Sequence, residues 1–272
     1  GGGAAAGGED TLRRRMAEVR VAERRRAGAE LLYLAVADEL RRAGAPMVEA
    51  LPGEDNTYEH VRPAAGADAA LSVHSPATRQ ILEEHWRRSY PSLQEVDPRQ
   101  IVRVPLFACG QSYAMTALHG YALRRAERRY RLERTLTGAG GAEASGDGLR
   151  NYLEAVAPKE FEESMLTLEA QMATEALVEA HFGDLNGLKA ALSQAMQDRG
   201  QAAMRDPNQE LTKALDNNEV ANTCIVCADL RRLVYEAASF GALLVEAEVR
   251  AQGLCDLTTA TDGRLWNFGV PD

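Results

Sequence analysis

Two glutamates stand where a helix should be apolar, and they are the strongest candidates for chemistry in this chain of 272 residues. Glu127 lies in a helical pattern over residues 110–136, and Glu248 lies in a second one over residues 230–250. A carboxylate on an apolar stripe is tolerated when an arginine and further donors satisfy it. Two facing carboxylates would instead suit acid–base chemistry or a metal ion.

The structural interpretation predicts that each glutamate is buried and fixes the register of one helix crossing. It also predicts that each is ion-paired with an arginine on a neighbouring helix. The alternative is a pocket between two helical repeats in which Glu127 and Glu248 carry acid–base or metal chemistry. The candidate arginines lie one turn from Glu127 on the same helix or in Leu-Arg pairs elsewhere: Arg124, Arg131, Arg150 and Arg231.

The cysteines and histidines do not form a recognisable metal site. Cys224 and Cys227 lack the βαβ context of a thioredoxin motif, and zinc would need two more ligands at a regular spacing. His85 and His181 are not part of the Glu-x-x-His pairs that bind di-iron in helical bundles. The sequence therefore predicts no metal, no other cofactor and no catalytic residues.

A solvated surface is the plainer explanation of the uneven charge along the chain, and a surface for a protein partner is the alternative. Residues 1–136 carry 21 basic and 18 acidic side chains, whereas residues 137–272 carry 10 and 22, for a total of −9. Such asymmetry can mark a protein partner or a head-to-tail contact between copies. The arginine run over residues 124–134 has few interleaved aromatics, so no nucleic-acid binding is expected. The best apolar run, residues 239–245, falls far short of about 20 residues and has Glu236 and Glu246 as polar flanks, so no transmembrane segment is expected.

Helical periodicity dominates the chain, and sustained two-residue alternation is missing, so the predicted fold class is all-α. Duplicated helical units should pack as an irregular bundle, and an Asp-Gly turn in the tail permits a small C-terminal hairpin. The long helices are expected over residues 11–42, 110–136, 160–182 and 229–250. The predicted organisation is a disordered low-complexity N-terminus (1–10), a first helical unit (11–137), a Gly-rich linker (138–148), a second helical unit (149–253) and a C-terminal tail (254–272).

The duplication rests on two internal matches that occur in the same order. The stretch PATRQILEEHW at residues 76–86 aligns with MATEALVEAHF at residues 172–182. Farther on, ALHGYALRRAERR aligns with ASFGALLVEAEVR, which places Gly120 over Gly241 and Glu127 over Glu248. A glycine on a core stripe persists most simply where another helix backbone passes close by. The glycine pair is therefore predicted to mark a pseudo-symmetric crossing of the two halves.

Four blocks of the sequence, spread from about Arg13 to Arg250, resemble a plastid and cyanobacterial family called domain of unknown function seven-sixty. UV-B-induced chloroplast proteins of plants belong to this family. The most specific piece is the GY-x-LR-x-x-E-x-R pattern, which the second repeat keeps only in part. The residues that carry the pattern and its second copy are Gly120, Tyr121, Arg124, Glu127, Arg129, Gly241, Glu248 and Arg250.

The resemblance implies a nuclear-encoded protein of the chloroplast stroma whose transit peptide has been removed, in line with the missing initiator Met. It implies no catalytic residues, because the family has no established activity. The expected function is that of a non-catalytic protein-binding, scaffold or regulatory factor, related to UV-B stress, whose partner is another plastid protein or complex. The alternative is a helical enzyme or small-ligand carrier with a pocket between the repeats that uses Glu127 and Glu248.

Overall fold

The computed structural model describes residues 3–45, 47, 67–137, 146–155, 166–253 and 257. The described part is mostly helical with one two-stranded sheet, so the all-α prediction is confirmed. The helices are α1 (Gly3–Arg42), α2 (Ala67–Ser72), α3 (Pro76–Ser89), α4 (Leu106–Leu136), α5 (Gly146–Ala155), α7 (Leu168–Phe182), α8 (Leu185–Asp198), α9 (Gly200–Arg205), α10 (Pro207–Asp216) and α11 (Cys227–Gln252).

Capping residues set several helix ends. Ser75 caps α3, because its Oγ accepts a hydrogen bond from the backbone N–H of Thr78, and Pro76 opens the first turn. Thr167 caps α7 in the same way, so this helix begins at Leu168 and not at residue 160 as predicted. The predicted start falls in residues 156–165, which lie outside the described part of the chain. Helix α1 begins at Gly3, inside the stretch predicted to be disordered.

The two strands were not predicted. Strand β1 (Ile101–Pro105) pairs antiparallel with β2 (Asn222–Val226), with Ile101 opposite Val226. Each strand has only five residues and runs directly into a long helix, so alternation is too brief to be recognised. The predicted C-terminal hairpin falls in residues 254–272, of which only Leu257 is described.

The crossing of α4 and α11 is pseudo-symmetric, as the sequence repeat predicts. A Cβ atom added to Gly120 would collide with the backbone carbonyl of Ala238, and one added to Gly241 would collide with that of Ala117. Ala117 and Ala238 occupy equivalent places in the repeat, so the two collisions are reciprocal. The two strand-to-helix junctions follow the same alignment, because Leu106 and Cys227 are equivalent as well.

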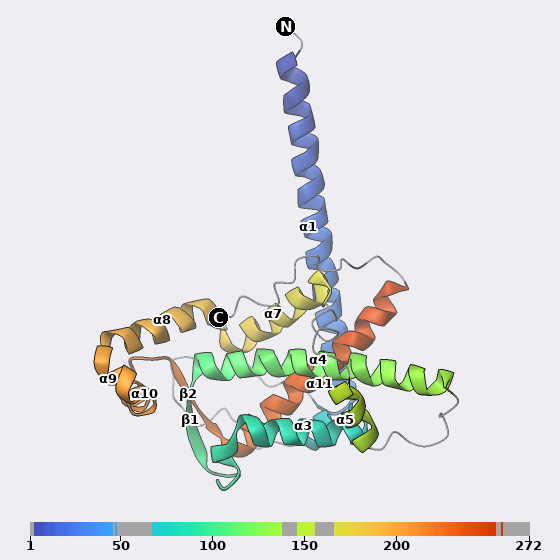
Figure 1. Cartoon of the computed structure of the whole chain (residues 1–272). Coiled ribbons are helices and arrows are strands. Elements are labelled where there is room, and N and C mark those ends of the chain that lie inside the picture. Colours follow the sequence, from blue (N-terminus) through green and yellow to red (C-terminus); the bar gives the residue numbers. More distant parts are fainter. Residues whose placement is uncertain are drawn as a thin grey trace.

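The two predicted units share one core (Figure 1). Helices α4 and α11 form its centre. Helix α1 of the first unit packs on α7 and α11 of the second, and α5 of the second packs on α3 and α4 of the first. The largest buried side chains come from both units, among them Leu40, Leu82, Leu177 and Phe240. Helices α8, α9 and α10 extend beyond the sheet at one end of the molecule.

The first part of α1 projects away from the body of the molecule (Figure 1). Every residue from 11 to 24 is exposed, and the first buried side chain along the described part of the helix is Ala29. We call residues 11–24 the α1 arm. In the part of the chain that the structure describes, no helix combines the length and the apolar character that crossing a membrane requires.

Candidate functional site

Glu127 is buried and held by arginines of its own helix. Its side chain lies on α4 and the residue is 2% exposed. Arg131 Nη2 donates to Oε1 at 2.7 Å, and Arg124 Nη1 donates to Oε2 at 3.1 Å. The predicted burial is therefore confirmed, whereas the prediction of an arginine on a neighbouring helix is wrong. Spacings of three and four residues place both arginines beside Glu127 on one helix, and no crossing is needed to bring them together.

The ion pairs that join α4 to α11 use Glu246. Arg124 Nε donates to Glu246 Oε1 at 2.7 Å, and Arg128 Nη1 donates to Oε2 at 3.0 Å. Arg124 therefore bridges Glu127 on its own helix and Glu246 on the other. The sequence analysis missed this role because Glu246 was taken only as the polar flank of an apolar run. The four-residue spacing of Arg124 and Arg128, which puts both on one helix face, was the available signal.

Glu248 is satisfied by hydroxyl groups. The residue is 4% exposed. Tyr121 Oη donates to Oε2 and Thr167 Oγ1 donates to Oε1, each at 2.6 Å. Among the described ion pairs none includes Glu248, so the predicted arginine partner is wrong here too. Arg125 acts one step away, because its Nη1 donates to Tyr121 Oη at 3.2 Å.

Tyr121 is fixed as a hydrogen-bond donor by its surroundings. Burial raises the pKa of its phenol, and the negative charge of Glu248 raises that pKa further. The phenol therefore stays protonated at neutral pH and donates a hydrogen bond to the carboxylate. Thr167 also links two elements, because its Oγ1 accepts from the backbone N–H of Ala170 and so caps α7.

The two glutamates therefore do not form an acid–base pair in the described structure. Glu127 is bonded to arginines and Glu248 to hydroxyls, and the described contacts do not join one carboxylate to the other. Both are almost completely removed from solvent. A buried carboxylate whose oxygens already accept hydrogen bonds stabilises a packing arrangement, and it has no free position for a substrate.

The remaining candidate residues lie apart from this centre. Arg129 pairs with Glu133 on the exposed side of α4, and Arg250 lies 3.8 Å from Glu39 of α1. The other two candidate arginines tie α3 to its neighbours and do not reach Glu127 or Glu248: Arg150 pairs with Glu84, and Arg231 lies 3.6 Å from Glu83.

A third buried carboxylate, Glu236, was missed by the sequence analysis. Tyr113 Oη donates to Glu236 Oε1 at 2.8 Å, and His181 Nε2 lies 3.5 Å from the same oxygen. Burial raises the pKa of Tyr33, and the negative charge of Glu236 raises that pKa further. These residues come from α11, α4, α7 and α1, so Glu236 stands where four helices meet. Its position beside an apolar run gave no sign that it is buried.

The histidines and cysteines occupy unlike sites. His85 stacks on His119 with ring centroids 4.6 Å apart, whereas its repeat equivalent His181 meets Tyr113 edge-on. Cys224 lies in β2 and Cys227 opens α11, and neither forms a disulfide. Among the described side chains, no group of three or more His, Cys, Asp or Glu is placed to hold a metal ion.

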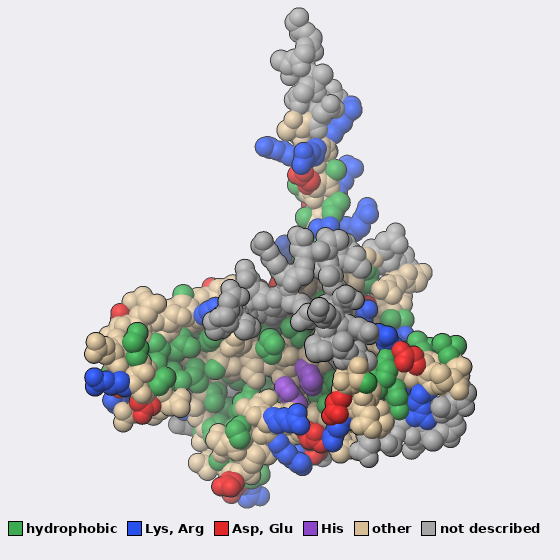
Figure 2. Space-filling model, viewed as in Figure 1, with side chains coloured by type: hydrophobic (Ala, Val, Ile, Leu, Met, Phe, Trp, Pro, Cys, Tyr) green, Lys and Arg blue, Asp and Glu red, His purple; other side chains and the backbone are tan. Residues whose placement is uncertain are grey.

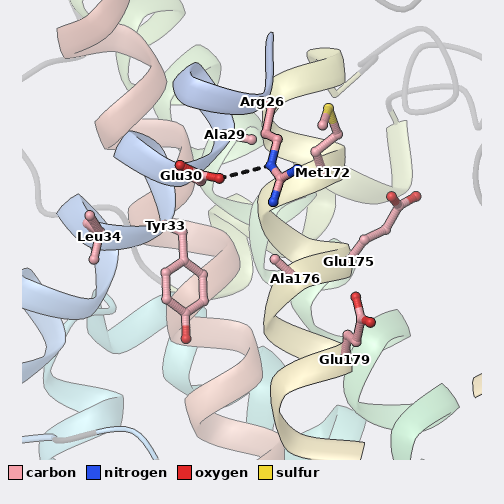
Figure 3. Close-up of a pocket in the computed structure, with 9 residues that line it drawn as sticks. All are labelled: Arg26, Ala29, Glu30, Tyr33, Leu34, Met172, Glu175, Ala176 and Glu179. Carbon is pink, nitrogen blue, oxygen red and sulfur yellow. Dashed lines mark hydrogen bonds and ion pairs between the residues drawn. The ribbon is translucent and has the colours of Figure 1, made fainter. Parts of the chain in front are cut away.

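A surface groove of about 550 Å³ runs between α1 and α7 (Figure 3). We call it the α1–α7 groove. Tyr33 and Leu34 of α1 and Met172 of α7 supply apolar lining, and neither Glu127 nor Glu248 reaches it. The charged groups along its sides are Arg26, Glu30, Glu175 and Glu179. Arg26 and Glu30 form an ion pair at 3.1 Å.

Comparison with known proteins finds similarity over part of the chain. Residues 15–136 match a family described as protein of unknown function (DUF760), so the resemblance seen in the sequence motifs is confirmed there. A chloroplastic UV-B-induced protein of Arabidopsis thaliana is 28% identical over 131 residues, which make up 48% of this chain. The match covers 31% of that relative, so it spans about a third of its length. No solved structure matches the chain.

Proposed function

We propose that this chain is a nuclear-encoded protein of the chloroplast stroma that acts by binding another protein chain and performs no catalysis. The chloroplastic relative supports the plastid location. The UV-B-induced description of that relative supports a role under light stress. The match to the relative is partial, so the binding role rests on the structure of this chain.

The exposed apolar stripe of the α1 arm carries the proposal. Leu12, Met16 and Val19 recur at spacings of four and three residues and therefore share one helix face. They are 60%, 48% and 56% exposed. Most of the stability of a helix in a protein comes from packing of its apolar face. A stripe of large apolar side chains on a projecting helix is therefore best explained as a surface that another chain covers.

The most chemically capable groups support binding over catalysis. Glu127, Glu236 and Glu248 are buried and accept hydrogen bonds from neighbouring side chains. The α1–α7 groove lies elsewhere and contains none of the three. A ligand pocket built on Glu127 and Glu248 therefore has no support in the described geometry.

Site-specific photo-crosslinking tests the binding role. A photoreactive residue would replace Met16 in the arm, and a control chain would carry it at Met204, which is exposed on α9. In intact plastids we expect crosslinks to another polypeptide from position 16 and few from position 204. Crosslinks from position 16 that remain entirely within one chain would contradict the proposal.

Import experiments test the location. A fluorescent fusion of the full-length precursor should accumulate in the stroma. Retention of the fusion in the cytosol would contradict this part of the proposal, and association with the thylakoid membrane would contradict the stromal assignment.

A further inference from the structure

The apolar stripe of the α1 arm leads into the α1–α7 groove. The face of α1 that bears Leu12, Met16 and Val19 continues through Glu30 to Leu34, because a helix repeats every 3.6 residues. Leu34 lines the groove and is itself exposed. From Leu12 to Leu34 the track is about 33 Å long at 1.5 Å per residue. One face of α1 thus connects the α1 arm to the α1–α7 groove.

The two ends of this track carry opposite charge. The arm end holds five arginines against two glutamates over residues 11–24. Basic side chains are prominent along this projecting helix in Figure 2. At the groove end Arg26 is paired with Glu30, while Glu175 and Glu179 of α7 stand exposed on the opposite wall. A helix that covers the whole track must therefore be acidic where it meets the arm and basic where it meets the groove.

We propose that a second copy of this chain covers the track, with the arm of each copy lying antiparallel in the α1–α7 groove of the other. This inference rests on the proposed function and names the partner. In an antiparallel pair the Arg13 and Arg15 region of one copy faces Glu175 and Glu179 of the other, and the reverse contact forms at the same time. Such an interface is closed and two-fold symmetric, so it gives a dimer and not an open chain.

The apolar groups match in this arrangement as well. When the two tracks run in opposite directions about a centre near Glu23, Leu12 of one copy comes opposite Leu34 of the other. Val19 comes opposite Ala27, which is also exposed. At the centre, Glu23 of each copy has Arg20 and Arg26 of the other within reach, which offsets the like charges there. A parallel pairing would place arm on arm, and the arginines would repel one another.

Charge exchange between two variants tests the dimer. The arm variant carries Arg13→Glu and Arg15→Glu, and the groove variant carries Glu175→Arg and Glu179→Arg. Sedimentation equilibrium should give a dimer for the parent chain. Each variant alone should have a dissociation constant raised about tenfold or more, because like charges then meet in both contacts. An equimolar mixture should restore the dimer, since both contacts of the mixed pair unite opposite charges.

Control measurements separate this arrangement from misfolding. Arg14 lies on the other side of the arm, so Arg14→Glu with the groove intact should leave the dimer unchanged. Circular dichroism should show parental helix content in every variant. A monomeric parent, variants that associate as the parent does, or a mixture that stays monomeric would each overturn the proposal.

The crosslinking experiment keeps the two proposals distinguishable. With a photoreactive residue at position 16, the dimer predicts crosslinks to α7 of a second copy. Crosslinks to a different protein would overturn the dimer and leave the binding function standing. The absence of any intermolecular crosslink would overturn both.

Discussion

At the scale of single residues, the repeat places a buried carboxylate at two equivalent positions, and each carboxylate is stabilised by a different kind of partner. Glu127 is neutralised by Arg124 and Arg131, whereas Glu248 receives two hydroxyl hydrogen bonds. Both solutions leave the carboxylate oxygens satisfied in a nearly dry environment. A polar group that is left without a hydrogen bond at such a buried site lowers the stability of the fold, because it has lost its hydration and gained no protein partner.

Substitution of the buried glutamates should therefore lower stability strongly. Glu248→Ala should reduce the free energy of unfolding by about 3 kcal/mol, because it leaves the buried hydroxyls of Tyr121 and Thr167 without an acceptor. Glu127→Ala should reduce it by about 2 kcal/mol, because Arg124 is part-buried and loses an acceptor, whereas the half-exposed Arg131 regains water. Glu133→Ala, at a half-exposed pair on the same helix as Glu127, should change it by about 0–1 kcal/mol. Denaturant unfolding measures all three. Unchanged midpoints for the two buried positions would show that these carboxylates do not stabilise the crossing.

His74 gives the stability a pH dependence. Burial, and then the charges of Arg124 and Arg79, lower the pKa of His74 from 6.5 to about 4. The unfolded chain therefore binds this proton first as the pH falls. The free energy of unfolding is therefore unaffected by His74 protonation above about pH 6.5 and falls progressively toward pH 4. Between pH 7 and pH 5 this loss of stability is about 2 kcal/mol.

The variant His74→Gln isolates this effect. It removes the titrating group and can still donate to Ser239 Oγ, which lies 3.1 Å from His74 Nε2. The variant should be less stable than the parent at pH 7, and its stability should fall less steeply on acidification. Parallel pH profiles of unfolding free energy for the two proteins would contradict the assignment.

At the scale of the elements, the helix crossing depends on its two glycines. A Cβ atom at Gly120 or Gly241 would meet a backbone carbonyl, which cannot turn aside as a side chain can. Gly120→Ala and Gly241→Ala should therefore each lower the free energy of unfolding by about 3 kcal/mol, although alanine favours a helix by about 1 kcal/mol. Gly253→Ala is the matched control, because its Cβ would meet only an ordinary contact. Equal stability of all three variants would show that the helices can separate freely.

The sequence predicted the helix crossing, which depends on the small size of glycine on an apolar helix face. The paired glycines of the repeat marked the crossing of α4 and α11. The partners of Glu127 and Glu248 could not be predicted, because they depend on the rotation of each helix at the crossing. Thr167 reaches Glu248 only because the chain folds α7 back beside α11, and no spacing in the sequence records that contact. The strands were not predicted because the pairing of Ile101 with Val226 joins segments that lie far apart in the sequence.

At the scale of the whole molecule, the two repeats are interlocked. Helix α1 packs on α7 and α11, so the first unit lacks part of its core without the second. A fragment of residues 1–137 alone should therefore fail to unfold cooperatively, and co-expression with residues 138–272 should restore the fold. Calorimetry of the fragment and of the reassembled pair measures this. A sharp unfolding transition for the isolated fragment would contradict the shared core.

The exposed face of α1 is the proposed binding surface for a second copy of this chain. Amide hydrogen exchange along residues 11–24, measured at several protein concentrations, tests this proposal most directly. An unpartnered arm frays and exchanges quickly, whereas a paired arm is protected. The amides of the arm should be protected at high concentration and lose that protection on dilution, whereas the exchange of α11 should stay unchanged. Rapid exchange of the arm at every concentration would contradict it.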